Sequence, residues 1–462
     1  MTLKGFQFTF LKQERKVIPK DDINADDTDT VNAVSDDGSF DDNDNEYGRL
    51  DKHPGEERRK RTQRVASCTL VGFILVLFVA LMSLNHRKSK SSLQAKNANT
   101  KVYCSGKLTF TLDEWLKENL GDSAHLCDPD FQPASSEAQI RQPVKVFLML
   151  GETNMIGAGQ ISGDVPGTLE YTVKTKKRFI NLVDPSSKAW IRRTDVRYVA
   201  VQNDMEVVRK EWLGVDDKYI FFGPELQFGY ILGELLQEPV LLIKASSGPQ
   251  SLGGDMLPPG SARYEFGGWT YAGYGDSPRR WPSKGVRPST SSNSWRAGHA
   301  YNSTLVNVKT ILNRISDYYP GATSYEVAGI AFWQGETDRR DSAYAGMYRR
   351  NLRDFIVKIR HDLNAPNAKF AIATLGQRGK DMTGNTLQIH DYQMQVGTMF
   401  PDFKGNVISV DTRSSWRTPY TPGHEGDEDY DNAAHYGNQA ETFMEVGNAL
   451  GLAMAKLLYG VE

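Results

Sequence analysis

Residues 144–150, VKVFLML, form a nearly continuous apolar run that leads directly into GETNMIGAGQ. Similar short apolar runs follow at residues 239–245, 326–334, 369–375 and 406–411. Such runs are typical of parallel strands that are covered on both faces. Segments that predict helices lie between and after them, at residues 224–236, 301–318, 343–363, 387–400 and 439–459. The alternation predicts a three-layer α/β domain over residues 144–462, with a mostly parallel five-stranded sheet.

The functional residues of such a domain are expected just after the strands, because parallel α/β sheets bind ligands at the carboxyl ends of their strands. One connection, residues 253–300, is too long for an ordinary loop. It is rich in Gly, Pro, Ser, Trp and Tyr without any periodic segment, so we expect a functional loop or insertion over the edge of the sheet. Its large aromatic residues either stack on sugar rings or form a small core of their own; they are Trp269, Tyr271, Trp281 and Trp295.

The segment before this domain predicts a membrane anchor. Residues 65–84, VASCTLVGFILVLFVALMSL, form an uncharged apolar run long enough for one transmembrane helix across a hydrocarbon core of about 30 Å. More basic residues precede the run, at 58–64, than follow it, at 87–90, and this bias predicts a cytosolic N-terminus. Residues 1–64 include a strongly acidic stretch at 21–51 with few apolar residues, which predicts a disordered cytoplasmic tail. The sequence therefore predicts a single-pass type II membrane protein.

Residues 85–143 are polar at their start and predict a stem and linker between the anchor and the domain. In an oxidising compartment Cys104 and Cys127 either form a disulfide or remain free thiols. Asn302 begins the only N-glycosylation sequon, Asn-Ser-Thr, which is used only if the domain is luminal or extracellular. We expect a glycoprotein of the secretory pathway, with its domain in the Golgi lumen, in another endomembrane compartment or at the cell surface.

Composition excludes several classes of function. Lys and Arg number 55 against 57 Asp and Glu, and the net charge of −2 argues against a nucleic-acid binder, which needs a basic surface to neutralise phosphates. No HExxH motif, P-loop or GxGxxG motif follows any of the expected strands, which disfavours a metal hydrolase or a nucleotide-binding protein. We expect no cofactor.

Four segments at the expected strand ends carry a family resemblance. They are GETNMIGAGQ at 151–160, KASSGPQSLGGDMLPPGS at 244–261, FWQGETDRRD at 332–341, and a block at 423–458 that begins GHEGDEDYDNAAHYGNQAETF. Together and in this order they resemble the sialate O-acetylesterase-like branch of the SGNH hydrolase superfamily, which includes carbohydrate acetylesterases. The resemblance covers residues 144–458 and implies an SGNH-hydrolase-like fold. It also implies an ester hydrolase that removes acetyl groups from carbohydrates or glycans.

The resemblance assigns roles to individual residues. Thr153 stands at the position of the family's serine nucleophile, and His435 matches the histidine that acts as general base. The family acid often stands three residues before that histidine, where this chain has Asn432, and the nearest carboxylate is Asp431. The oxyanion would be bound by the Thr153 N–H, by the N–H of Gly248 or its neighbour, and by the Gln334 amide. Two further residues are candidates for binding the oxyanion or the substrate; they are Asn154 and Glu336.

Three departures from the family pattern bear on activity. The extra methyl of Thr153 restricts its side chain and crowds the nucleophile. Pro249 replaces the second glycine of the usual pair and has no N–H to donate to an oxyanion. Glu152 replaces the glutamine of the family motif GQSNM, and its carboxylate disfavours the standard mechanism unless it points away or is protonated. These departures leave open a catalytically weak or inactive pseudoenzyme that acts as a glycan-binding or scaffold protein.

Each assigned residue also has a structural alternative. Thr153 either attacks the substrate or caps the helix that follows the first strand. Gln334 and Glu336 either serve the site or are satisfied polar groups that fix the loop after the third strand. Asp431 lies in an acidic run and is either the third catalytic residue or part of a solvated loop.

Overall fold

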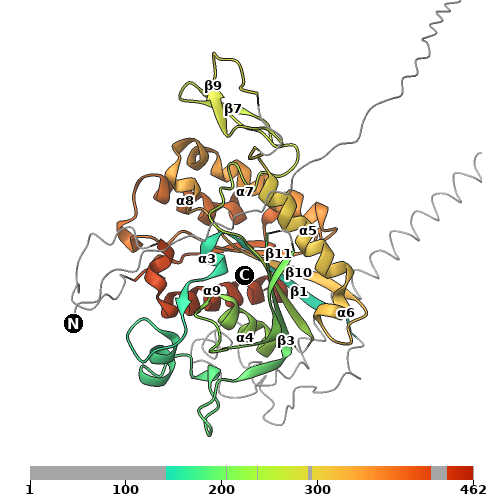
Figure 1. Ribbon diagram of the computed structural model, residues 1–462, viewed down its shortest axis with the longest axis vertical. Coiled ribbons are helices and arrows are strands. Elements are labelled where there is room, and N and C mark those ends of the chain that lie inside the picture. The colour runs from blue at the N-terminus through green and yellow to red at the C-terminus, as the bar shows by residue number, and fades with distance from the viewer. Residues whose placement is uncertain (1–141, 204, 237, 290–293, 418–433, 461–462) are drawn as a thin grey trace, which may run out of the picture. The chain divides into compact units, whose positions relative to one another are not determined.

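The computed structural model describes residues 142–203, 205–236, 238–289, 294–417 and 434–460 (Figure 1). The predicted acidic tail, transmembrane helix and stem, with Cys104 and Cys127, lie outside the described residues. Within the described ranges no helix is both long enough and apolar enough to cross a membrane.

A seven-stranded sheet forms the centre of the domain, and its order is β12-β11-β10-β1-β6-β3-β4. Its strands are β1 (Val144–Gly151), β3 (Arg192–Gln202), β4 (Glu206–Gly214), β6 (Val240–Ala245), β10 (Tyr325–Trp333), β11 (Lys369–Ala373) and β12 (Val407–Val410). All neighbouring strands are parallel except β3 and β4, which are antiparallel. The α/β class and the five predicted strands, which lie side by side, are confirmed.

The prediction of five strands for the sheet is wrong, because β3 and β4 extend it to seven. These two strands carry charged residues among the apolar ones, as in RRTDVRYVAVQ of β3. The prediction rested on continuous apolar runs, so it did not include them.

Helices cover both faces of the sheet (Figure 1). They are α3 (Thr153–Ile156), α4 (Glu225–Leu235), α5 (His299–Asn313), α6 (Ile315–Tyr318), α7 (Ser342–Asp362), α8 (Gly384–Met399) and α9 (Ala440–Tyr459). The five predicted helices are present, but the predicted helix 301–318 is interrupted at Arg314 between α5 and α6.

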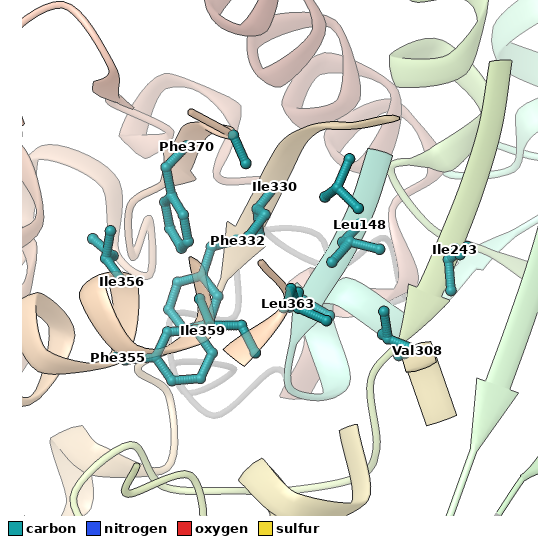
Figure 2. Close-up of a cluster of buried hydrophobic side chains, with 14 of the residues drawn as sticks. Leu148, Ile243, Val308, Ile330, Phe332, Phe355, Ile356, Ile359, Leu363 and Phe370 are labelled. Atoms are coloured by element: carbon teal, nitrogen blue, oxygen red, sulfur yellow. The ribbon is translucent and has the colours of Figure 1, made fainter. Parts of the chain in front are cut away.

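Two apolar cores lie between the layers. Alternate residues of β1 point to opposite faces, so that Leu148 packs with residues of α5, α7 and α8, and Phe147 with residues of α4 and α9. Figure 2 shows part of the first core, where the Phe332 ring of β10 packs against Phe370 of β11 and Phe355 of α7. Because both faces are buried, β1 is apolar along its length, which is why its run of residues was recognisable.

The insertion at 253–300 contains a small antiparallel sheet of β7 (Tyr264–Phe266), β8 (Trp269–Tyr271) and β9 (Arg280–Pro282). Strands of three residues are too short to show periodicity, so the sequence did not indicate them. The remaining strands, β2 (Gly159–Gln160) and β5 (Phe221–Phe222), pair with each other.

The aromatic residues of the insertion mostly form a core of its own. Trp281 is buried with Leu257, Ala272 and Ala297, and Trp295 packs against this group. Tyr271 packs against residues of α7. Trp269 differs, since 40% of it is exposed and Arg280 lies over its ring. The alternative of a small core is confirmed for Trp281 and Trp295.

Candidate active site

The turn after β1 approaches β10 too closely for any residue but glycine. A Cβ added to Gly151 would lie 2.1 Å from the carbonyl oxygen of Trp333, and the φ of Gly151 is +151°. This approach sets the start of α3, whose first residue is Thr153. The N-cap of α3 is Glu152, and within the described residues the Thr153 hydroxyl makes no hydrogen bond. The alternative in which Thr153 caps this helix is therefore wrong.

Glu152 faces the loop that follows β10 (residues 334–341, hereafter the β10 loop). Its Oε1 accepts the N–H groups of Gly335, Glu336 and Thr337 at 2.8, 2.6 and 3.2 Å, and its Oε2 accepts the Thr337 hydroxyl. Burial raises the pKa of Glu152 to about 7, because removal from water disfavours the charged form more than these donors favour it. Its carboxylate joins two loops and is turned to the backbone of the β10 loop.

Asn154 and Glu336 are paired with each other. The Asn154 Nδ2 donates to Glu336 Oε2 at 2.7 Å, and Gln377 Nε2 donates to the same oxygen at 3.3 Å. The Arg340 guanidinium lies 3.9 Å from the other oxygen of Glu336. The Asn154 Oδ1 is buried and has no hydrogen-bond partner among the described residues. This oxygen is the atom of the Asn154 amide that has no partner in the described part of the chain.

The Gln334 side chain is fully engaged by its surroundings. Its Nε2 donates to the Gln250 carbonyl at 2.9 Å and to Asp338 at 2.6 Å, and its Oε1 accepts the Tyr348 hydroxyl at 2.9 Å. An amide nitrogen carries two N–H groups, and both therefore have acceptors. The resemblance assigned this amide to an oxyanion, whereas the structure uses it to hold the loop after β6.

Asp338 is a buried residue that the sequence did not single out. Its carboxylate accepts the N–H groups of Leu252 and Gly253, both at 2.8 Å, in addition to Gln334. Burial raises the pKa of Asp338 to about 6. Asp338 thereby ties the loop after β6 to the β10 loop. The only available signal was its place inside the FWQGETDRRD segment, which does not reveal where a side chain points.

Gly248 lies in open space on the loop after β6. A Cβ at this position would meet nothing within 4 Å, and the neighbouring Pro249 is exposed. Among the described residues, the backbone N–H groups of Gly248 and Thr153 have no acceptor. Two of the three predicted oxyanion donors are therefore available.

His435 lies in a tight turn before α9. Its φ of 59° is left-handed, as are those of Tyr436 and Gly437. The Tyr436 ring packs 5.2 Å from the Trp333 ring, and its hydroxyl accepts the Gly376 N–H at 3.0 Å. This neighbour fastens the histidine turn to the end of β10, beside Gly151.

One ring nitrogen of His435 has no hydrogen-bond partner in the described structure. Its Nδ1 is buried and has no hydrogen-bond partner among the described residues. Asp431, the candidate acid, lies outside those residues, as does the acidic run around it. Within the described residues, no group of three or more His, Cys, Asp or Glu side chains is arranged to hold a metal ion.

A buried ion pair contacts the C-terminal end of α3. The Lys244 Nζ lies 2.7 Å from Glu225 Oε2 and donates to the Ile156 carbonyl at 2.6 Å. Burial lowers the pKa of Lys244, while Glu225 opposes that change. Both residues occur in stretches that match family motifs, FGPE at 222–225 and the segment at 244–261. Their contacts assign them to the support of the α3 turn.

Comparison with known proteins identifies the C-terminal part of the chain. Residues 286–449 match the family model described as carbohydrate esterase, sialic acid-specific acetylesterase. The matched range contains Gln334, Glu336 and His435, whereas Thr153 and Gly248 precede it. The predicted resemblance to sialate O-acetylesterase-like carbohydrate esterases is confirmed by this match. No curated protein matches the chain.

Three solved structures are similar to 68% of the chain. A protein from Arabidopsis thaliana is 16% identical with a TM-score of 0.39, over 99% of its own length. A carbohydrate acetylesterase from Xanthomonas citri is 14% identical with a TM-score of 0.41, over 57% of its length. NanS is 12% identical with a TM-score of 0.38, over 97% of its length.

Proposed function

We propose that this chain is a carbohydrate O-acetylesterase-like hydrolase with Thr153 as nucleophile and His435 as general base. The family match of residues 286–449 supports the class of reaction. One structural observation supports the site itself. The Thr153 hydroxyl and the Thr153 and Gly248 N–H groups have no partner within the described residues, whereas the polar side chains of the β10 loop around them are engaged.

The reaction would proceed through an acetyl-enzyme. The Thr153 hydroxyl oxygen attacks the acetyl carbonyl carbon while His435 accepts the hydroxyl proton, and the Thr153 and Gly248 N–H groups stabilise the oxyanion. The bond to the sugar oxygen then breaks, and that oxygen takes the proton from His435. Water, deprotonated by His435, then attacks the acetyl carbon. The bond to the Thr153 oxygen breaks, that oxygen takes the proton back from His435, and acetate is released. We assign the acid that orients His435 to Asp431, through the Nδ1 that has no partner among the described residues.

A glycan-binding pseudoenzyme is the second candidate. Both N–H groups of Gln334 are engaged, and Pro249 has none, so the oxyanion would have fewer donors than in the family pattern. Removal of one such donor costs about 3 to 4 kcal/mol of barrier. A weak or absent turnover with an intact pocket is the expected behaviour of this alternative.

Acetate release distinguishes the two candidates. The purified full chain is incubated with a panel of O-acetylated glycans, as wild type, Thr153→Ala and Thr153→Ser, with Thr310→Ala of the exposed face of α5 as a matched control. Turnover that is lost only in Thr153→Ala establishes a threonine esterase. Turnover that appears only in Thr153→Ser establishes a disabled hydrolase. Equal turnover in wild type and Thr153→Ala would refute the assigned nucleophile.

We further propose that residues 65–84 anchor the protein in a secretory membrane, with the hydrolase domain luminal or extracellular. Asn302 is exposed on α5, which supports its use as a glycosylation site in that topology. Endoglycosidase treatment of the cell-expressed chain should increase its mobility, and Asn302→Gln should remove the shift. A wild-type chain without any shift would argue against a luminal domain.

We also propose a Cys104–Cys127 disulfide, because the same topology would place both cysteines in an oxidising compartment. Alkylation of the secretory-pathway protein followed by peptide mass mapping should find both thiols protected until reductant is added. Free alkylation of both without reductant would contradict the disulfide.

A further inference from the structure

A pocket of about 230 Å³ lies at the carboxyl ends of β3 and β6, beside α3. Its walls come from the end of α3, from β3, β4 and β6, and from the segment before α4. Ile156 and Ser246 line it, and these residues belong to the same two loops as Thr153 and Gly248. Since α3 rises about 1.5 Å per residue, its two ends are roughly 5 Å apart. The pocket therefore adjoins the short helix that begins with the candidate nucleophile.

The pocket contains an arginine with unused hydrogen-bonding capacity. Arg209 of β4 is only 9% exposed, and its Nη2 is buried without a hydrogen-bond partner among the described residues. Its nearest carboxylates, those of Glu211 and Glu225, lie at 3.7 and 3.8 Å, which is beyond hydrogen-bond distance. The guanidinium carbon instead lies over the Tyr219 ring, 3.5 Å from its centre. It is thus held in place by stacking, with N–H groups left over.

The other charges in the pocket are already matched. Lys244 bonds to Glu225 and to the Ile156 carbonyl, so this pair is neutral and structural. Arg209 is the remaining charge among the lining residues, and the lining carries one net positive charge. A buried guanidinium with free N–H groups fits a carboxylate, whose two oxygens match its planar fork.

The size and the rim of the pocket restrict the ligand further. Its volume is below the range of about 300–1,000 Å³ for drug-sized ligands, which leaves room for a single small ring. Tyr219 and Phe221 line it, and aromatic side chains pack readily against the apolar face of a sugar. These features favour an acidic monosaccharide unit over a neutral one.

We propose that this pocket is a subsite for a hexuronic acid residue of the glycan, with the carboxylate bound to Arg209 and the ring against Tyr219 and Phe221. The proposal rests on the proposed function for the presence of a glycan, but it concerns binding and not hydrolysis. The substrate would then be an acetylated glycan that contains an acidic sugar. This acidic sugar either carries the ester or is next to the sugar that carries it.

Binding of ester-free sugars tests the subsite without reference to turnover. Glucuronate and galacturonate are titrated into the full-length protein and followed by ligand-observed NMR, with glucose and galactose as uncharged counterparts. The uronates should bind and the neutral sugars should not. The same result is expected in Thr153→Ala, so that loss of catalysis and loss of binding are separated.

Three variants sharpen the test. Arg209→Gln should weaken uronate binding at least about 30-fold, since it removes one partner of a buried charge pair. Val208→Glu, at a lining residue that is 39% exposed, should weaken it as well by placing a competing carboxylate beside Arg209. Arg349→Gln removes an exposed arginine stacked on Tyr392 outside the pocket and should bind as wild type does.

Several results would overturn the subsite. These are equal binding of neutral and acidic sugars, no uronate binding by the wild type, or unchanged binding in Val208→Glu. Thermal unfolding identifies a misfolded Arg209→Gln, in which case Val208→Glu alone decides. Uronate binding without any acetate release would leave the subsite standing and count against the proposed hydrolase.

Discussion

The β10 loop and the α3 turn face each other at the same edge of the sheet, yet they differ in how their polar groups are satisfied. In the β10 loop, Gln334 and Asp338 bond to each other and to the loop after β6. In the α3 turn, the hydroxyl and the N–H of Thr153 have no partner among the described residues. The hydroxyl and N–H of half-buried Thr153 are therefore free to bind a substrate, whereas the engaged groups of the β10 loop are not.

This difference divides the family-like motifs into two kinds of residue. Glu152, Gln334 and Asp338 hold three loops together, and Thr153, Gly248 and His435 present unpartnered atoms. The division predicts that substitutions in the first kind change stability, whereas removal of the unpartnered atoms of the second kind lowers turnover. Four substitutions test it, from the largest expected effect to the smallest.

His435→Ala should lower acetate release by at least about 10³-fold, because the general base acts in both halves of the reaction. The free energy of unfolding should stay within about 1 kcal/mol of the wild-type value, because the substitution breaks no hydrogen bond between Nδ1 and the described residues. Turnover assays and urea denaturation measure the two effects. His361→Ala, at an exposed position of α7, is the control, and unchanged turnover in His435→Ala would remove this residue from the mechanism.

Asp338→Ala should destabilise the domain by about 3 kcal/mol, because it leaves the Leu252 and Gly253 N–H groups and the Gln334 amide without their acceptor. Urea denaturation measures the loss. Asp317→Ala on α6, where the carboxylate is largely exposed, should change stability by less than about 1 kcal/mol. Equal effects at the two positions would refute the division, since they would make the buried anchor no more important than a surface charge.

Glu152→Gln should alter the pH dependence of stability. The pKa of Glu152 is raised from 4.5 to about 7, so the native state retains its proton to higher pH than the unfolded chain does. The free energy of unfolding of the wild type should therefore fall as the pH rises from about 4.5 to 7. Gln lacks this titration and can still accept the three N–H groups through its carbonyl oxygen. The variant should be more stable than the wild type at pH 8 by about 1 to 3 kcal/mol.

Denaturation of both proteins at pH 4.5 and pH 8 checks this prediction. The two pH profiles should converge at low pH, separate between about pH 4.5 and 7, and run parallel above that range. Profiles that are parallel throughout would mean that Glu152 does not titrate in this range.

The structure also explains which parts of the molecule the sequence could predict. The five central strands and the helices between them were recognisable, because burial on both faces makes strands such as β1 and β6 apolar throughout. The outer strands β3 and β4 carry charged residues among the apolar ones, and these residues concealed them. The order of the motifs predicted which loops meet at the sheet edge, including the place of Thr153 and Asn154 at the start of α3.

The direction of each side chain could not be predicted in this way. Gln334 has the residue type expected of an oxyanion donor, but Asp338, four residues further on, takes one of its N–H groups. Arg209 was not singled out because its strand was not recognised. In both cases the deciding contact comes from a segment whose position only the folded chain defines.

Gly248→Ala should have the smallest effect of the four. A methyl group at this position meets nothing within 4 Å, and the residue does not have a positive φ, so stability should rise or stay equal within about 1 kcal/mol. Turnover should be retained, because the N–H group remains. Gly151→Ala is the matched contrast, since its methyl would collide with the Trp333 carbonyl. Urea denaturation compares the two, and a marked loss of stability in Gly248→Ala would contradict the open position of the loop.

The central place of β1 has a consequence for how the domain is made. This strand pairs with β10, and Lys145 of β1 bonds to Glu326, which is 181 residues later in the chain. At a synthesis rate of roughly 5–20 residues per second, β1 waits on the order of 10 to 40 s before that partner exists. Throughout this delay an apolar strand with unpaired edges is exposed to other chains. Pairing at such separations is also slow once the chain is complete, so we expect biogenesis of this protein to depend on chaperones that cover β1.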